Sequence, residues 1–204
     1  MTTALSLPTP LPVLAESALP RVLTRTGATV VLGTALTALA AQVVVPIPGS
    51  PVPVTGQTFA VLLTAAALGP ARGLASQVLY LALGAAGLPV FTQGAHGVQA
   101  LFGATGGYLV GFLLASLIVG AGSRRGTDRS MLRELAVLAL ASAAIYACGV
   151  TWLAIVTGMG LATAVAVGMA PFLVGDVFKA VLASSLLPAA WKLVTRLDSS
   201  GSAR

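Results

Sequence analysis

Residues 171–191 read PFLVGDVFKAVLASSLLPAAW, a stretch that is apolar apart from two charges and two serines. It is as long as the ~20 residues that cross a bilayer as a helix. Yet it carries Asp176 and Lys179, and a charged side chain costs ~2.5–3.5 kcal/mol at the centre of an inserted helix. The stretch therefore predicts a membrane-spanning helix, and the free-energy cost of burying its two charges indicates that they have a function.

The composition of the whole chain agrees with a membrane protein. Of the 204 residues, 57% are hydrophobic and 8% are charged, and the mean hydropathy is +0.98. Roughly a quarter of the residues of a soluble domain are charged, so we expect the lipid bilayer to surround this chain. The net charge of +6 would suggest nucleic acid in a soluble protein. Here the basic residues lie between apolar runs, where they set membrane orientation, and we expect no nucleic-acid partner.

Six membrane spans can be drawn from the apolar runs and the prolines and glycines that interrupt them. They cover about 28–45, 55–68, 74–86, 108–120, 135–157 and 171–194. The second and third are short and joined by the turn GPARG, so they can instead form a re-entrant hairpin. The fold class expected is an all-α integral membrane protein with a bundle of six transmembrane helices.

The positions of the basic residues predict the orientation of the bundle. Six crossings place four segments on one side, and these carry ten of the eleven basic residues: Arg21, Arg25, Arg72, Arg124, Arg125, Arg129, Arg133, Lys192, Arg196 and Arg204. The positive-inside rule makes that side the cytoplasm, so both termini are expected there. The expected organisation is a mobile cytoplasmic tail (1–27), a membrane domain (28–196) and a second cytoplasmic tail (197–204). The domain has an outer glycine-rich loop at about 87–107 and a basic loop at about 121–133.

Lys179 is the eleventh basic residue, and it lies three positions after Asp176 in the sixth span. At that spacing both side chains project from one face of a helix and can touch. One interpretation is an ion pair that merely tolerates burial. Replacing such a pair by apolar residues is often neutral or stabilising, so the second interpretation is a polar site facing a cavity that opens to the outside.

Other polar residues are expected at the outer surface, where they can converge on the same cavity. Gln57 can contribute to this site or satisfy loop carbonyls, and Tyr108 can contribute or lie in an interfacial belt. Gln93 and His96 lie in the outer loop, where a single histidine can also be simply solvated. The candidate site residues are Asp176, Lys179, Gln57, Tyr108, Gln93 and His96.

Several kinds of chemistry are not indicated by the sequence. It contains no HExxH, GxSxG, CxxC or Walker A motif, and it has one histidine and one cysteine, Cys148. We therefore expect no enzyme activity, no cofactor and no metal site. If transport is driven by ATP, other subunits must hydrolyse it.

Four stretches are similar to those of the BioY family, the biotin-specific substrate-capture (S) subunits of energy-coupling-factor transporters. They read PIPGSPVPVTGQT, LGPARGLASQVLYLALGAAGLPVF, GATGGYLVGF and PFLVGDVFKAVLASSLLP. The resemblance implies a six-helix bundle that binds biotin near its outer face. It implies that Asp176 and Lys179 correspond to the family's functional aspartate and lysine, and that Gln57 corresponds to the glutamine of its TxQT motif.

The resemblance also implies partners, namely a transmembrane coupling subunit and ATPase subunits. The family docks on the coupling subunit through small residues in its first helix. In this chain a small-residue stripe is formed by Thr29, Gly33, Thr37 and Ala41, although such stripes also serve packing within a protein.

The expected function is high-affinity capture of biotin for uptake across the bacterial cytoplasmic membrane. Two alternatives remain open from the residues alone. The first is an ion-coupled carrier of another small carboxylate, in which Asp176 cycles a proton. The second is a membrane scaffold that transports nothing.

Overall fold

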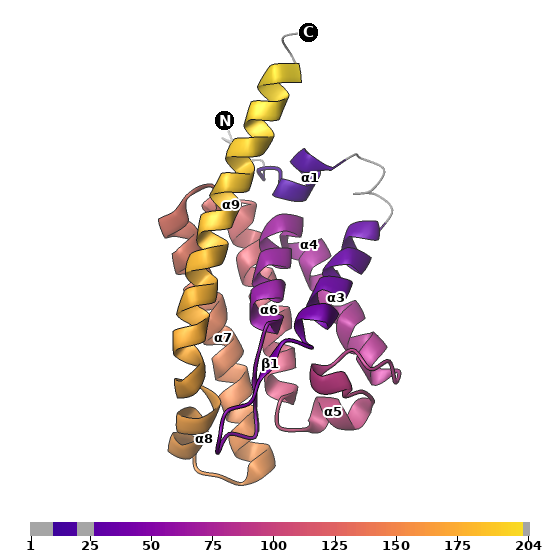
Figure 1. Cartoon of the computed structure of the whole chain (residues 1–204), viewed down its shortest axis with the longest axis vertical. Helices are drawn as coiled ribbons and strands as arrows, with labels where there is room; N and C mark the ends of the chain where they lie inside the picture. The colour runs from indigo at the N-terminus through magenta and orange to yellow at the C-terminus, as the bar shows by residue number, and fades with distance from the viewer. Residues whose placement is uncertain (1–9, 20–26, 202–204) are drawn as a thin grey trace, which may run out of the picture.

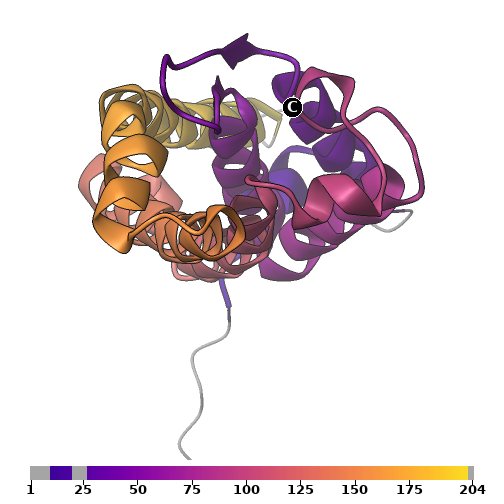
Figure 2. The same cartoon turned by 90° about the horizontal axis from the view of Figure 1, so that it is seen from below.

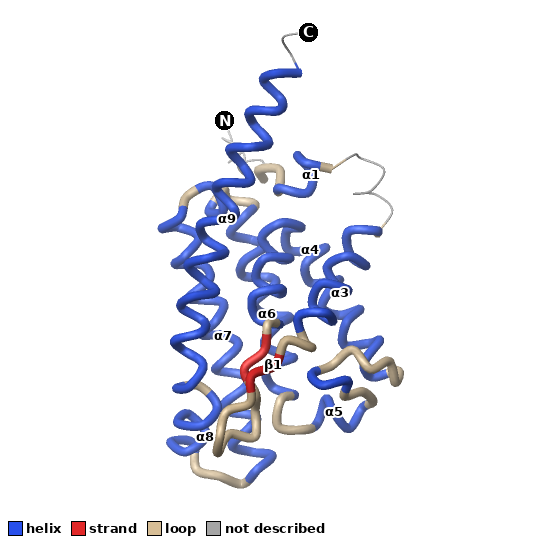
Figure 3. The backbone as a smooth tube through the Cα atoms, in the orientation of Figure 1, coloured by secondary structure: helices blue, strands red, loops and turns tan. Residues whose placement is uncertain are grey.

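The computed structural model describes residues 10–19 and 27–201, most of which are helical (Figure 1). The α-helices are α1 (Leu14–Ala18), α3 (Ala28–Ala40), α4 (Gln57–Ala85), α5 (Val98–Phe102), α6 (Gly106–Ser123), α7 (Met131–Thr157), α8 (Leu161–Gly168) and α9 (Leu173–Gly201). Short 3-10 helices are η1 (Thr92–Gly94), η2 (Thr127–Arg129) and η3 (Ala170–Phe172). A small antiparallel ribbon, drawn red in Figure 3, pairs β1 (Val44–Val45) with β2 (Val54–Thr55).

Four helical stretches of the described residues are long and apolar enough to cross a membrane. They are Gln57–Ala85, Gly106–Ser123, Met131–Thr157 and Leu161–Arg196, whereas α3 is apolar but shorter. A mostly helical, multi-pass membrane protein, as predicted, is therefore confirmed. The first helix ends at Ala40 rather than near residue 45, and the last extends to Gly201, beyond the predicted end at 194.

The second and third predicted spans form one helical hairpin, α4, with a reversal at Gly69. The φ angle of this residue is +79°, a left-handed value that favours glycine. The two arms of α4 lie against each other, because a side-chain carbon built at Gly73 would lie 3.0 Å from the Cα atom of Ala65. A hydrogen bond between Gln57 and Tyr80 also joins the arms. The hairpin thus brings the beginning and the end of α4 together at one end of the bundle.

The small-residue stripe of α3 faces α4 and is buried along its whole length. A side-chain carbon built at Gly33 would lie 2.6 Å from the Ser76 Oγ and Thr64 Cγ2 atoms. Gln77 Nε2 donates a hydrogen bond to Thr37 Oγ1 at 3.1 Å. Small side chains let two helices approach closely, and here they bring α3 onto the hairpin. The structure therefore packs the stripe against α4.

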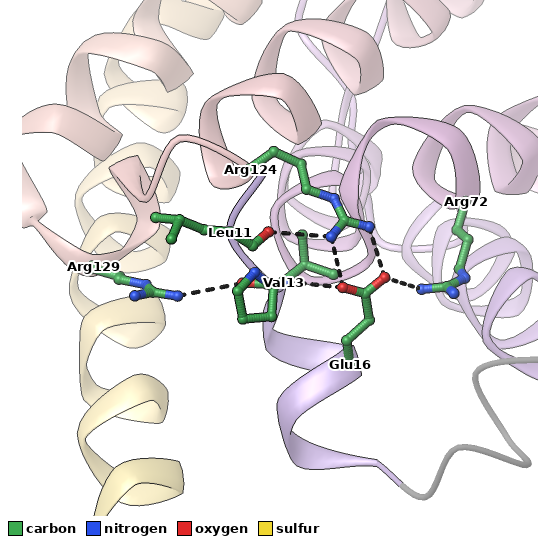
Figure 4. Close-up of polar contacts among 7 residues, drawn as sticks. Leu11, Val13, Glu16, Arg72, Arg124 and Arg129 are labelled. Atoms are coloured by element: carbon green, nitrogen blue, oxygen red, sulfur yellow. Dashed lines mark hydrogen bonds and ion pairs between the residues drawn. The ribbon is translucent and has the colours of Figure 1, made fainter. Parts of the chain in front are cut away.

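The N-terminal segment 10–19, expected to be part of a mobile tail, is folded against one end of the bundle (Figure 4). Val13 is fully buried and packs against the turn of α4 at Gly69. The Glu16 carboxylate accepts hydrogen bonds from Arg72 at 3.0 Å and from both terminal nitrogens of Arg124 at 2.6 and 2.7 Å. Burial would raise the pKa of Glu16, but the bonds and charges of the two arginines, with the Val13 N–H, outweigh it and hold the pKa below its usual value.

The loop after α6 lies at the same end of the molecule, which is the upper end in Figure 1. Trp191 of α9 donates from Nε1 to Asp128 Oδ2 at 2.6 Å, and the Arg129 guanidinium lies 4.3 Å from the centroid of the Trp191 ring. Arg72 of α4 and the basic residues of this loop therefore gather at one end, as the predicted topology requires. Arg21, Arg25 and Arg204 lie outside the described residues.

Candidate functional site

A cavity of about 200 Å³ lies toward the other end of the bundle, the end that faces the viewer in Figure 2. Its polar lining residues are Thr55, Gln57, Thr58, Thr92, Gln93, Thr105, Tyr108, Tyr146, Asp176 and Lys179. Its apolar lining residues are Val52, Pro53, Phe91, Ala95, Ala100, Leu109, Phe112, Ile145 and Phe172. Apolar walls with a few convergent polar groups are typical of a small-molecule site.

Lys179 is bonded to three protein oxygens at the wall of this cavity. Its Nζ atom lies 2.8 Å from the Thr55 carbonyl oxygen, 3.0 Å from Thr58 Oγ1 and 3.1 Å from Asp176 Oδ1. A lysine ammonium has three N–H donors, so each has an acceptor. The lysine thereby fastens the first turns of α9 to the beginning of α4.

Asp176 is the partner of that lysine and lies in the first turn of α9. Lys179 holds its Oδ1 atom, and the hydroxyl of Tyr146, on α7, donates to its Oδ2 atom. The side chains of Asp176 and Lys179 are 13% and 18% exposed. This leaves the pair accessible from the cavity, in contrast to a fully enclosed ion pair.

Gln57 stands at the start of α4 and is the centre of a second hydrogen-bond network. Its Nε2 atom donates to the Tyr80 hydroxyl at 2.7 Å, and its Oε1 atom accepts from Thr55 and Thr92, each at 3.0 Å. The Tyr80 hydroxyl in turn donates to the Val90 carbonyl at 3.1 Å. The glutamine therefore ties both arms of α4 to the loop that covers the cavity.

That loop, residues 86–105, is anchored by Phe91. The ring of Phe91 is buried and contacts Tyr80 edge to face, with centroids 5.4 Å apart. It fills the space beside Gly84, where any side-chain carbon would lie 2.0 Å from the ring. The glycine is therefore required by the close approach of this aromatic anchor.

The other three candidate residues occupy different positions. Gln93 lines the cavity with φ +58°, the one positive φ among the described residues other than glycine. The ring of Tyr108 also lines it, and its hydroxyl donates to the Gly168 carbonyl at 2.7 Å. His96 is exposed, lies 3.0 Å through Nδ1 from the Gly94 carbonyl of its own loop, and is not a lining residue.

Comparison with known proteins places the chain in a family. Residues 11–196 match the model described as the BioY family, which is most of the sequence. The chain belongs to the BioY family. The resemblance predicted from the four stretches is thus confirmed, and the family is one of transporters rather than enzymes.

Three relatives of this BioY-family chain show how far the similarity extends. The "Probable biotin transporter BioY" of Pyrococcus horikoshii is 40% identical over 154 residues, which cover 76% of this chain and 88% of the relative. The "Biotin transporter BioY" of Thermotoga maritima is 38% identical over 151 residues, covering 74% and 86%. That of Rhizobium etli is 36% identical over 143 residues, covering 67% and 76%.

A solved structure agrees with the sequence matches. The S-component for biotin from an ECF-type ABC transporter superposes with a TM-score of 0.77 at 26% identity, covering 86% of this chain and 95% of the other. The BioY fold therefore accounts for nearly all of the described bundle.

The structure of this BioY-family chain brings five of the six candidate site residues to one cavity and leaves His96 outside. It also adds Tyr146, which the sequence did not single out. Tyr146 lies within the apolar run 135–157 and 30 residues before Asp176, so no local spacing connects the two. The available signal was a hydroxyl within a membrane span, where buried polar groups need partners.

Proposed function

We propose that this chain is the substrate-binding subunit of an energy-coupling-factor type transporter and takes up biotin across the cytoplasmic membrane. The observation that carries the proposal is the cavity with its Asp176–Lys179 pair, in a fold that matches a biotin S-component with a TM-score of 0.77. The names of the relatives support biotin as the substrate.

Biotin fits the chemistry of the cavity. It has a carboxylate, a ureido group with two N–H donors and one carbonyl, and an apolar thioether ring. Asp176 can accept from N–H donors, whereas Phe91, Phe112 and Phe172 supply apolar surface for the ring. A ligand acceptor at Lys179 would share or replace one of its three present acceptors. Gln57, Gln93 and Tyr108 complete the proposed binding site.

The proposed topology has six crossings: α3, the two arms of α4, α6, α7 and α9. An even number places both termini on one side, and the basic end identifies that side as the cytoplasm. The cavity then faces outward, where biotin is captured. Within residues 10–19 and 27–201, no three His, Cys, Asp or Glu side chains are grouped to hold a metal ion.

The proposed transporter needs other subunits. The chain has no Walker A motif, so ATP hydrolysis is assigned to separate ATPase subunits, joined through a transmembrane coupling subunit. The small-residue stripe Thr29, Gly33, Thr37 and Ala41 stays a candidate for this docking, although its residues are buried against α4 in the conformation described.

The deciding experiment is to purify the full chain in detergent and identify any retained ligand by mass spectrometry, followed by titration with biotin. Retained biotin and saturable binding are the expected results. Another small carboxylate, with pH-dependent uptake in the absence of partner subunits, would favour an ion-coupled carrier. A folded protein that binds neither would favour a scaffold.

A further inference from the structure

The carboxylate of Asp176 is held from two different helices. Lys179, one turn further along α9, donates to Oδ1 at 3.1 Å. Tyr146 approaches from α7 and donates its hydroxyl to Oδ2. A carboxylate held by one oxygen can still rotate about its side-chain bonds, whereas one held at both oxygens has a fixed plane.

The fixed carboxylate retains acceptor capacity. An ionised carboxylate has about four lone-pair sites, and the hydrogen bonds from Tyr146 and Lys179 occupy two of them. Asp176 lines the cavity and its side chain is 13% exposed. A bound ligand can therefore reach the remaining sites, and it must do so with hydrogen-bond donors because the carboxylate can only accept.

Tyr146 differs from the other two tyrosines of the chain in what its hydroxyl binds. Tyr80 donates to the carbonyl oxygen of Val90 and Tyr108 donates to that of Gly168, so both hydroxyls satisfy backbone groups. The hydroxyl of Tyr146 instead donates to a charged side chain within the cavity. Tyr146 is 8% exposed, so packing on α7 holds the hydroxyl in place.

We infer that Tyr146 is a positioning residue that gives the site its selectivity for ligands with N–H donors. By fixing Asp176 Oδ2, it aims the unused lone pairs of the carboxylate at the ligand. Its effect on the ligand is exerted through Asp176, whose carboxylate it holds. This inference rests on the proposed function, because it assigns the ureido N–H groups of biotin as the donors that the carboxylate selects.

The test compares two ligands in the wild-type protein and in Tyr146→Phe, each as the purified full chain. One ligand is biotin, and the other is biotin methylated at both ureido nitrogens, which has lost its N–H donors. A hydrogen bond to a charged group is worth enough to change affinity by about tenfold or more. We expect Tyr146→Phe to weaken biotin binding about tenfold and to leave the affinity for the methylated ligand unchanged. The discrimination between the two ligands should therefore fall about tenfold.

Trp191→Phe is a matched control at the opposite end of the bundle. It also removes an aromatic donor from a buried carboxylate, since Trp191 Nε1 donates to Asp128 Oδ2 at 2.6 Å. This variant should melt at a lower temperature than the wild type but discriminate between the two ligands as the wild type does. A loss of discrimination in this control would mean that general loosening explains the result, and the inference would be overturned.

Two outcomes for Tyr146→Phe would also overturn the inference: unchanged affinity for biotin, or equal weakening for both ligands. Tyr146→His, whose ring N–H can still donate, supplies a second readout that remains available if the phenylalanine variant does not fold. Because its ring can replace the lost donor, it should keep at least part of the wild-type discrimination. A folded Tyr146→His protein that binds biotin but no longer discriminates between the two ligands would count against a donor role at this position. If the wild-type protein itself does not bind biotin, the proposed function fails, which is a different result from all of these.

Discussion

The charged pair at the cavity shows how single side chains are satisfied in this protein. Lys179 has three oxygen acceptors, and both oxygens of Asp176 have donors. Removing one member of a buried pair leaves the other uncompensated and costs ~3–5 kcal/mol. A single replacement therefore perturbs folding and ligand affinity together, and a double replacement is needed to separate them.

The double variant Asp176→Asn with Lys179→Met removes both charges at nearly constant volume. Because replacing a buried ion pair by neutral groups is often neutral or stabilising, we expect this protein to insert and to melt near or above the wild-type temperature. It should no longer retain biotin, since an asparagine side chain at this position cannot act as a charged acceptor. Melting temperature and biotin affinity are measured on the same detergent-purified sample.

The single variants Asp176→Ala and Lys179→Ala serve as comparisons and should lose both stability and affinity. A double variant that folds well and binds biotin with wild-type affinity would contradict the proposed binding role. The pair would then be a structural ion pair only.

The helices of this protein are held together by close approach and by polar contacts between helices. The stripe on α3 lies against both arms of α4, where Gly33 leaves no room for a side chain. Thr34 Oγ1 donates to the Ser76 carbonyl at 2.8 Å across the same interface. In lipid, packing and interhelical hydrogen bonds of this kind replace the hydrophobic effect between helices.

Gly33→Leu should therefore destabilise the isolated subunit, because the new side chain overlaps Thr64 and Ser76. Overpacking of this kind costs typically ~1–3 kcal/mol, and we expect a lower melting temperature together with weaker biotin binding. Leu32→Phe is the control on the same helix, since Leu32 is 62% exposed and should tolerate a larger side chain. If Gly33→Leu instead lost uptake but kept normal stability and normal biotin binding, the result would favour a docking role for the stripe.

The N-terminal segment gives a prediction of pH dependence. Glu16 has a pKa below the ordinary value of 4.5, because burial raises the pKa by less than Arg124 and Arg72 lower it. A lowered carboxyl pKa contributes stability that is fully present above pH ~4.5 and is lost as pH falls through the lower value. We expect Glu16→Gln to melt below the wild type at pH ~7 and the difference to shrink as pH falls below ~4.5.

Thermal unfolding of the two purified proteins between pH ~3 and pH ~7 measures this difference. Arg125→Gln, at an exposed basic residue of the same end, changes the net charge by one in the opposite sense and should not show this pH-dependent difference. A gap between the wild type and Glu16→Gln that stays constant down to the lowest pH would show that the ion pairs of Glu16 are not its source.

The charged residues of the molecule fall into two groups at different depths. Glu16, Arg72, Arg124 and Arg129 gather at one end of the bundle, and the cavity with Asp176 and Lys179 lies toward the other. This arrangement follows the different free-energy costs of charge at different depths, because a basic side chain costs little at a membrane surface and much within the hydrocarbon core.

Cysteine labelling in intact cells tests the proposed orientation. In a Cys148→Ser background, His96→Cys and Arg125→Cys place one thiol at an exposed position of each end. An impermeant maleimide should react with His96→Cys directly and with Arg125→Cys only after the membrane is permeabilised. The reverse pattern would invert the topology and place the cavity in the cytoplasm.

The sequence was sufficient to predict a mostly helical, multi-pass membrane protein and to single out the charged pair. Hydropathy over about 20 residues and the positions of basic residues can be read from the linear chain. The first determines whether a segment inserts into lipid, and the second determines its orientation. Asp176 and Lys179 were found because charge within an apolar run is rare and because the i, i+3 spacing is local helix geometry. The family resemblance was also carried by contiguous motifs.

The inward faces of the helices, and the contacts between distant residues, depended on the folded chain. In a soluble helix, hydrophobic periodicity marks the buried face, but in lipid both faces are apolar and the pattern carries little information. For this reason the sequence left open whether the α3 stripe faces a partner or the interior, and it did not connect Tyr146 with Asp176. The docking of Val13 and Glu16 likewise depends on the turn at Gly69 and on Arg124, which are distant in the sequence and which only the packing of α4 and α6 brings together.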